Sequence, residues 1–145
     1  MPFSFQKLDD EVVAEMTEHD FQRNIVRTLQ MQNIFVFAVP NSQKLLQTKN
    51  QFARMKFLSS LKAEGFMAGV ADLVVLLPGG KAIFLEIKNP DKPSPQSDTQ
   101  KKFQADIERL GFEYWLILNW ADFELFLSNA QLFVINFIKK NYEKT

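Results

Sequence analysis

The chain has 145 residues, of which 46% are apolar and 23% charged, a composition typical of one soluble globular domain with a hydrophobic core. The absence of cysteine and the presence of a single histidine, His19, exclude disulfides, thiolate zinc sites and multi-histidine metal sites. Basic and acidic residues balance at 17 each, so the whole-chain charge gives no argument for nucleic-acid binding.

The first predicted elements are a helix and a strand. Thr17 followed by Asp20 is typical of a helix N-cap with an acidic first turn, so the helix begins at Glu18. Its apolar stripe recurs every four residues and consists of Phe21, Ile25 and Leu29. The aromatic and β-branched run 34–39 predicts a strand that ends at Pro40 and Asn41.

A second helix is predicted over residues 49–64, with a buried stripe of Phe52, Met55, Leu58 and Leu61. The stretch 43–62 contains five basic residues and no acidic one: Lys44, Lys49, Arg54, Lys56 and Lys62. Such a segregated basic stretch can contact phosphates even when the total charge cancels. A solvated helix face is the alternative.

A β-hairpin follows. The apolar run 72–77 fits a buried strand, residues 78–80 form a tight Pro-Gly-Gly turn, and the run 81–88 returns antiparallel. Alternation along the returning strand predicts one face with Ile83, Leu85 and Ile87 and the opposite face with Phe84, Glu86 and Lys88.

The last third of the chain predicts a helix, a strand and a long apolar helix. After a proline-containing loop, Ser97 and Gln100 form a capping-box pattern that begins a helix. Its buried stripe is Phe103, Ile107 and Leu110, ended by Gly111. Residues 113–118 predict a strand. Residues 120–140 predict a helix, broken near Ser128 and Asn129.

This order of elements predicts a single α/β domain over residues 1–145, with a mixed central β-sheet flanked by helices. Within it we expect an N-terminal extension (1–16), a core (17–118) and a C-terminal helical segment (119–145). Fifteen phenylalanines indicate a dense core, an oligomer interface or both. The phenylalanine-rich segment 123–138 is the candidate interface, with core as an equally open alternative.

Asp72, Glu86 and Lys88 are the candidate chemical residues. The hairpin folds the start of one strand beside the end of the other, so the two carboxylates converge and Lys88 follows on the same strand face. Convergent carboxylates suit a hard cation such as Mg²⁺, and a nearby ammonium can hold water or stabilise a phosphoryl transition state. The alternative is a cross-strand carboxylate and a lysine solvated at a sheet edge.

The segment 69–88, GVADLVVLLPGGKAIFLEIK, resembles the core of the PD-(D/E)XK nuclease superfamily, with Asp72 followed by Glu86-Ile87-Lys88 as the E-x-K element. More narrowly, residues 17–118 resemble the VRR-NUC family. The further matching features are Gly65, Gly69, Ser97, Gln100, Glu18, Pro40 and Asn41. Ala71 departs from the proline that usually precedes the aspartate and that shapes the turn.

The resemblance implies a restriction-endonuclease-like core and a set of site residues. It implies that Glu18, Asp72, Glu86 and the Ile87 carbonyl hold Mg²⁺, with Mn²⁺ as a substitute, and that Lys88 orients the attacking water. Gln100 would support the site from its helix, or serve only as the capping partner of Ser97. Gln22, one turn after Glu18, lies on the same helix face, whereas His19 is expected to be an exposed helix residue.

We therefore expect a magnesium-dependent DNA endonuclease acting on branched or structured DNA such as four-way junctions. Symmetric cutting of two strands favours a homodimer. The DNA-contacting candidates are Asn41, Lys49, Arg54, Lys56 and Lys62, although Asn41 could simply end a strand. The alternatives are a sequence-specific restriction endonuclease and a non-catalytic DNA-binding protein on the same fold.

The location expected for this protein is the cytoplasm, without membrane association. The start MPFSFQKLDDE lacks the basic and then apolar order of a signal peptide. No apolar run approaches the length of a membrane span, about 20 residues. No nucleotide cofactor is expected.

Overall fold

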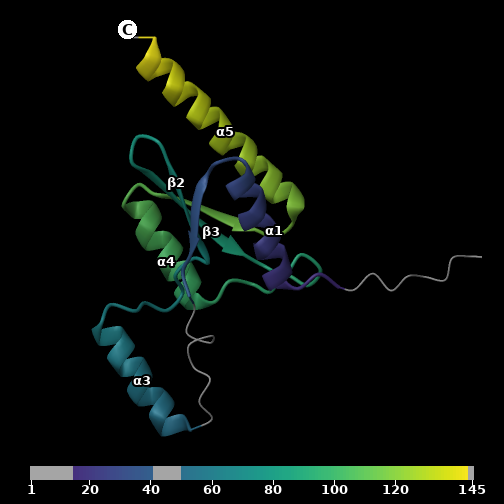
Figure 1. The fold of residues 1–145 in the computed structure, drawn as a ribbon. Helices are drawn as coiled ribbons and strands as arrows, with labels where there is room; N and C mark the ends of the chain where they lie inside the picture. The colour runs from purple at the N-terminus through teal and green to yellow at the C-terminus, as the bar shows by residue number, and fades with distance from the viewer. Residues whose placement is uncertain (1–14, 41–49, 144–145) are drawn as a thin grey trace, which may run out of the picture.

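A computed structural model of the chain describes residues 15–40 and 50–143. Its centre is a four-stranded sheet with the order β1-β2-β3-β4 (Figure 1). The strands are β1 (Phe35–Ala38), β2 (Leu73–Leu77), β3 (Lys81–Ile87) and β4 (Glu113–Ile117). The β1–β2 and β2–β3 pairs are antiparallel and the β3–β4 pair is parallel, which confirms the predicted α/β class with a mixed sheet.

Four helices accompany the sheet in the described residues: α1 (Glu18–Met31), α3 (Gln51–Ala63), α4 (Asp98–Arg109) and α5 (Trp120–Tyr142). The predicted helix starts are confirmed where the caps were identified. The Thr17 hydroxyl accepts a hydrogen bond of 3.1 Å from the Asp20 amide, and Ser97 and Gln100 form a reciprocal capping box. None of these helices is long and apolar enough to cross a lipid bilayer.

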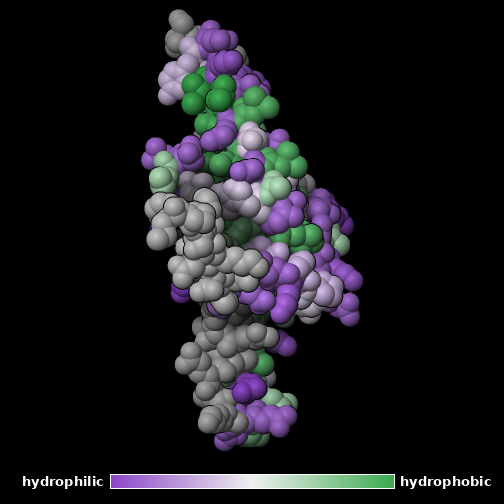
Figure 2. Space-filling model, turned by 90° about the vertical axis from the view of Figure 1, so that its right-hand side faces the viewer, coloured by the Kyte–Doolittle hydropathy of each residue, from purple (hydrophilic) through white to green (hydrophobic). Residues whose placement is uncertain are grey.

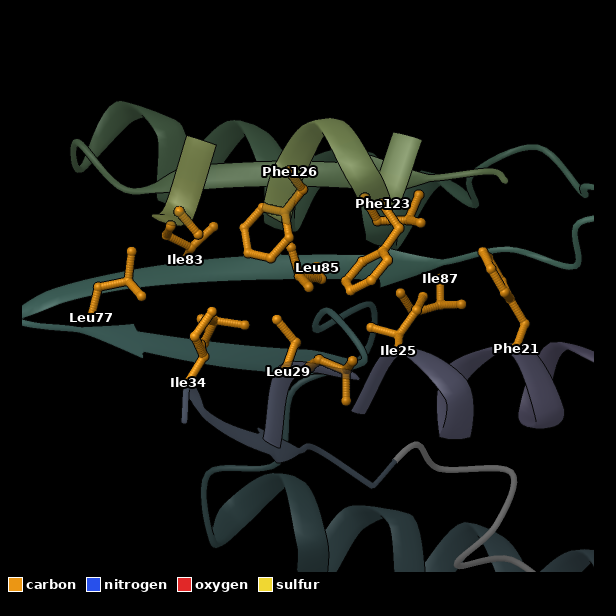
Figure 3. Packing of buried hydrophobic residues seen from close by; sticks show 14 residues of the cluster. Phe21, Ile25, Leu29, Ile34, Leu77, Ile83, Leu85, Ile87, Phe123 and Phe126 are labelled. Atoms are coloured by element: carbon orange, nitrogen blue, oxygen red, sulfur yellow. The ribbon is translucent and has the colours of Figure 1, made fainter. Parts of the chain in front are cut away.

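The main core lies between one face of the sheet and the helices α1 and α5. Phe21, Ile25 and Leu29 of α1 pack from one side and Phe123 and Phe126 of α5 from the other, as Figure 3 shows. The sheet contributes the predicted inner face of β3: Ile83, Leu85 and Ile87. The period-two pattern of β3 is therefore confirmed.

The opposite face of the sheet is covered by α4 and carries a smaller cluster. Phe103 and Ile107 of α4 pack with Ala71, Phe84 and Tyr114. The Phe84 ring meets the Phe103 ring edge to face, with centroids 5.5 Å apart. Because α4 rests on β3 and β4, its first turn lies beside the C-terminal end of β3.

The predicted buried stripe of the second helix is wrong. Phe52 is 78% exposed, and α3 buries no residue. The apolar residues of α3 are distributed all round its axis, so no single face is selected for burial, and the helix extends away from the sheet (Figure 1).

Two further predictions are corrected near helix ends and breaks. Leu110 is exposed, because α4 ends at Arg109 and the chain turns away at Gly111 with a φ of +90°. The expected break near Ser128 and Asn129 is absent, since α5 is continuous. Burial of flanking side chains holds the helix through these two weak helix formers.

The segment 123–138 proves to be part of the core on one side only. Phe123, Phe126 and Ala130 are buried, whereas Leu125, Leu132, Ile135 and Ile138 are exposed. The interpretation of this segment as core therefore holds for the inward residues. The outward residues are not covered by any described part of the chain.

Candidate active site

A small hollow lies where α1, the end of β1 and the start of β2 meet. Its volume is about 220 Å³, and it is lined by Glu18, His19, Gln22, Ala38, Val39, Pro40 and Asp72. The antiparallel pairing of β1 and β2 brings these parts together, since the Val39 amide donates to the Asp72 carbonyl over 2.9 Å. Glu18, at the first helical residue of α1, thereby shares a hollow with Asp72, and Gln22 reaches the same region.

The hairpin brings Asp72 beside the end of β3. Leu73 pairs with Leu85, so the residue before Leu73 lies next to Glu86 and Ile87. The Ile87 backbone amide donates to Asp72 Oδ2 over 2.8 Å. This bond fixes the orientation of the Asp72 carboxylate. Asp72 therefore lines the hollow and also lies next to the buried Glu86.

Glu86 and Lys88 are buried charges, with 2% and 5% of their surface exposed. Lys88 Nζ lies 3.7 Å from Glu86 Oε1. β3 is an inner strand, paired with β2 on one side and β4 on the other, and the Lys88 amide extends the pairing by donating to the Ile117 carbonyl. The alternative of a solvated pair at a sheet edge is therefore wrong for Glu86 and Lys88.

Gln100 connects the two buried charges to the start of α4. Its side-chain oxygen accepts from Lys88 Nζ over 3.0 Å and from the Ser97 amide over 2.9 Å. Its side-chain nitrogen donates to Glu86 Oε1. Gln100 is therefore both the capping partner of Ser97 and a hydrogen-bond partner of Glu86 and Lys88. The helix start and the site share one amide group.

The pKa of Glu86 is raised to about 8, chiefly by burial and also by the neighbouring charges of Asp72 and Glu18, against the opposing effect of Lys88. The second carboxylate oxygen, Oε2, is buried and has no hydrogen-bond partner among residues 15–40 and 50–143. A buried carboxylate oxygen without a partner is costly. Buried carboxylates retained at such a cost are typical of functional sites.

The donor set fits a hard divalent cation in part. No group of three or more histidine, aspartate and glutamate side chains across residues 15–40 and 50–143 is arranged to hold a metal ion. Mg²⁺, however, usually takes one or two carboxylates from the protein and keeps several waters or substrate oxygens. Asp72 and Glu86 supply such a pair, and the unpartnered Glu86 oxygen is the observation that favours a cation.

The chain matches no family model, no curated protein and no solved structure. The assignment of these residues to a reaction therefore depends on their geometry and chemistry.

The predicted DNA-contacting residues fall into two groups. Arg54, Lys56 and Lys62 lie on α3, which is exposed over most of its surface. Because α3 is inserted between the end of β1 and the start of β2, it is joined to the end of the sheet that carries Asp72. Asn41 and Lys49 lie outside the described residues.

Two site neighbours were not identified from the sequence. Gln96 donates over 3.1 Å to the hydroxyl of Tyr114, and burial together with the charge of Glu86 raises the pKa of that phenol. Tyr114 therefore stays protonated beside the site. No local pattern marks either residue, because their approach depends on the parallel pairing of β4 with β3.

Gly69 positions the start of α4, and Gly69→Ala is expected to destabilise the protein and displace Gln100. A Cβ at Gly69 would overlap the Thr99 carbonyl group and lie 2.7 Å from the Gln100 backbone nitrogen. Gly80→Ala is the matched control, because its φ of +76° is close to the +81° of Gly69 and no atom of the described residues lies within 4 Å of the added Cβ. The left-handed conformation alone costs about 1–2 kcal/mol.

Urea unfolding of the two variants separates strain from overlap. Gly80→Ala should lose only the conformational cost, and Gly69→Ala clearly more. Equal losses would show that contact with α4 is unimportant.

Proposed function

We propose that this protein is a metal-dependent endonuclease that hydrolyses phosphodiester bonds in DNA. The observation that carries the proposal is the buried Glu86, which has one unpartnered oxygen and lies beside the carboxylate of Asp72 and the ammonium of Lys88. A pair of carboxylates that can hold a divalent cation, beside a fixed ammonium, can support phosphodiester hydrolysis without a histidine or cysteine taking part.

Each residue has a distinct role in the proposal. Asp72, Glu86 and the Ile87 carbonyl would hold Mg²⁺ or Mn²⁺. Glu18 lines the same hollow as Asp72 and would reach the cation through one of the waters that the cation keeps. The bound cation would polarise a phosphoryl oxygen and lower the pKa of a water. Lys88 would orient the attacking water and offset charge that develops on the phosphate. Gln100 would hold the Lys88 and Glu86 side chains in a fixed position relative to α4, through the hydrogen bonds described above.

The sheet supports a restriction-endonuclease-like core as part of the proposal. The antiparallel β1–β2–β3 unit followed by α4 and a parallel β4 places Asp72, Glu86 and Lys88 at one end of the sheet. This arrangement agrees with the resemblance of residues 17–118 to the VRR-NUC family. Branched DNA is the substrate class that the resemblance favours, and a homodimer would cut two strands symmetrically.

Cleavage of labelled DNA substrates tests the proposal. Four-way junctions, flaps, single strands and plain duplexes would be incubated with Mg²⁺, Mn²⁺ or EDTA, with Lys88→Ala as a comparison. Metal-dependent cutting of branched substrates is expected. Cutting of plain duplex at one fixed sequence would favour a restriction endonuclease. Binding without metal-dependent cutting by the folded wild type would favour a non-catalytic DNA-binding protein.

The exposed helix α3 is proposed to contact DNA phosphates. The double variant Lys56→Ala/Lys62→Ala is therefore expected to weaken binding to all DNA sequences alike. Each lost phosphate contact lowers the slope of log affinity against log salt by about 0.9, so a decrease of roughly two is expected. Fluorescence anisotropy across a salt series measures the slope.

A matched variant, Arg109→Ala/Lys140→Ala, removes two exposed charges from the last turns of α4 and α5. These turns lie at the opposite end of their helices from the site, so an unchanged slope is expected. Equal losses in both double variants would show that α3 has no special part in binding.

A further inference from the structure

α5 has a second apolar stripe on the side that faces away from the core. Its positions recur alternately at three and four residues, the heptad spacing of a coiled coil. All six are exposed, and four are large and apolar: Leu125, Ser128, Leu132, Ile135, Lys139 and Tyr142. We call these six residues the outer seam.

The outer seam is separate from the surface that holds α5 on the sheet. Phe123, Phe126 and Ala130 occupy the opposite side of the helix and are buried. At the far end of α5, Phe137 lies over Gly79 in the β2–β3 turn. Within the described residues the inward stripe completes the core, and the outer seam is not needed for it.

The outer seam is strongly exposed. Leu125, Leu132 and Ile135 have 59%, 57% and 49% of their surface accessible. α5 continues beyond the β2–β3 turn, and Figure 2 shows hydrophobic side chains on the upper part of the molecule, where Figure 1 places the C-terminal half of this helix. Contiguous apolar surface of this kind is typical of an interaction site.

We infer that the outer seam pairs α5 with α5 of a second copy of this chain, in antiparallel orientation. A heptad seam is self-complementary, so the second copy supplies the matching surface. Centring the pair between Leu132 and Ile135 places Leu132 opposite Ile135 of the second copy. The same register places Leu125 opposite Tyr142, and Ser128 opposite Lys139.

The charges on the seam decide the orientation. A parallel pair in register would place Lys139 against Lys139 of the second copy, two like charges at an interface position. The antiparallel pair places the long Lys139 side chain opposite the small Ser128, so no two charged residues of the outer seam face each other. The flanking residues at the centre of the pair are also uncharged: Asn129, Gln131, Asn136 and Ile138. Charged flanking residues, Glu124 and Glu143, occur only at the two ends.

The exposed area meets the requirement of a specific dimer. The five exposed apolar residues on or beside the seam are Leu125, Leu132, Ile135, Ile138 and Tyr142. With about 200 Å² for each large side chain, complete burial of their exposed parts would remove on the order of 500 Å² per copy and about 1,000 Å² for the pair, the lower bound for a specific interface.

The role of this dimer in DNA cleavage rests on the proposed nuclease function. α5 begins near the site, because it starts three residues after Ile117, whose carbonyl accepts a hydrogen bond from the Lys88 amide. The helix is about 34 Å long at 1.5 Å per residue, so an antiparallel pair places the two sites at opposite ends of the helix pair. Each site would then act on a separate strand.

Measurement of molecular mass tests the inference without any activity assay. Sedimentation equilibrium of the wild type is expected to give twice the 16.8 kDa of one chain at micromolar concentrations. Leu132→Glu/Ile135→Glu should be monomeric and still folded by circular dichroism, with a melting temperature that no longer depends on protein concentration. Leu110→Glu, which places the same charge at an exposed leucine on the end of α4, should remain dimeric.

A monomeric wild type, or a dimer that survives Leu132→Glu/Ile135→Glu, would overturn the inference. The molecular mass of Asp72→Asn tests dimerisation independently of the proposed nuclease activity. That variant should be dimeric whether or not the protein cleaves DNA.

Cysteine pairing tests the orientation, since the chain contains no cysteine. A mixture of Leu132→Cys and Ile135→Cys should form a disulfide between different copies under mild oxidation. Each variant alone should cross-link much less. Strong cross-linking of each variant with itself would replace the antiparallel pair with a parallel one.

Discussion

Asp72→Asn is expected to reduce metal-dependent DNA cleavage by about a thousandfold or more, with the fold retained. The neutral amide loses the charge that attracts a divalent cation, and loss of a central electrostatic group costs roughly 10²–10³ in rate or more. Asn keeps an oxygen that can accept the hydrogen bond from the Ile87 amide. The local structure therefore has no reason to collapse.

The measurement is single-turnover cleavage of a labelled four-way junction with Mg²⁺, together with circular dichroism. Asp106→Asn is the matched control, because it neutralises an aspartate on α4 whose partners are Lys102 and Arg109, away from the site. Its rate should equal that of the wild type. A folded Asp72→Asn protein that cuts as fast as the wild type would refute the catalytic role of Asp72.

Glu86→Gln is expected to stabilise the metal-free protein while abolishing cleavage. The pKa of Glu86 is raised from 4.5 to about 8, so the folded state disfavours the ionised carboxylate. Below the unfolded pKa both states bind the proton and there is no penalty. Between the two pKa values the unfolded state loses its proton first, and folding stability falls as the pH rises. Glutamine removes this loss.

The expected gain is small at pH 5 and roughly 3–4 kcal/mol at pH 7 to 8, or about 10–13 °C in Tm for a chain of this length. Thermal unfolding in EDTA across this range measures it. Glu113→Gln is the matched control. A hydrogen bond from Lys81 lowers the pKa of that carboxyl, so its substitution should give no gain. A Glu86→Gln gain that does not grow with pH would contradict the prediction.

Stabilisation by replacement of a buried glutamate has a functional meaning. A side chain such as Glu86, which lowers folding stability in the metal-free protein, is expected to contribute when a ligand is bound. Divalent cation would offset the cost of Glu86, so Mg²⁺ should raise the Tm of the wild type more than that of Glu86→Gln.

Local patterns in the chain were enough to predict most helices and strands and the approach of Asp72 to Glu86. Thr17 and Ser97 mark helix starts because a capping side chain acts within three residues. The Pro-Gly-Gly turn sets the pairing of β2 with β3, and alternation then assigns Ile83 and Glu86 to opposite faces. These features depend on neighbours close in the chain, so the sequence carries them.

Packing of the elements against one another determines which of these residues are buried and which of them form hydrogen bonds with each other. Glu86 and Lys88 are sealed in because β4 pairs in parallel beside β3 and α4 covers them, and Gln100 reaches both through that packing. Periodicity alone cannot distinguish an inner strand from an edge strand, since both alternate.

The same limit explains α3 and α5. The sequence shows apolar residues on both helices but does not show how much sheet is available to cover them. The sheet face buries Phe123 and Phe126 of α5, whereas Leu132 of α5 is exposed to solvent. In the described part of the chain, no residue of α3 is buried. Burial is decided by the area that the assembled elements offer one another, a property of the packed domain that a single helix does not contain.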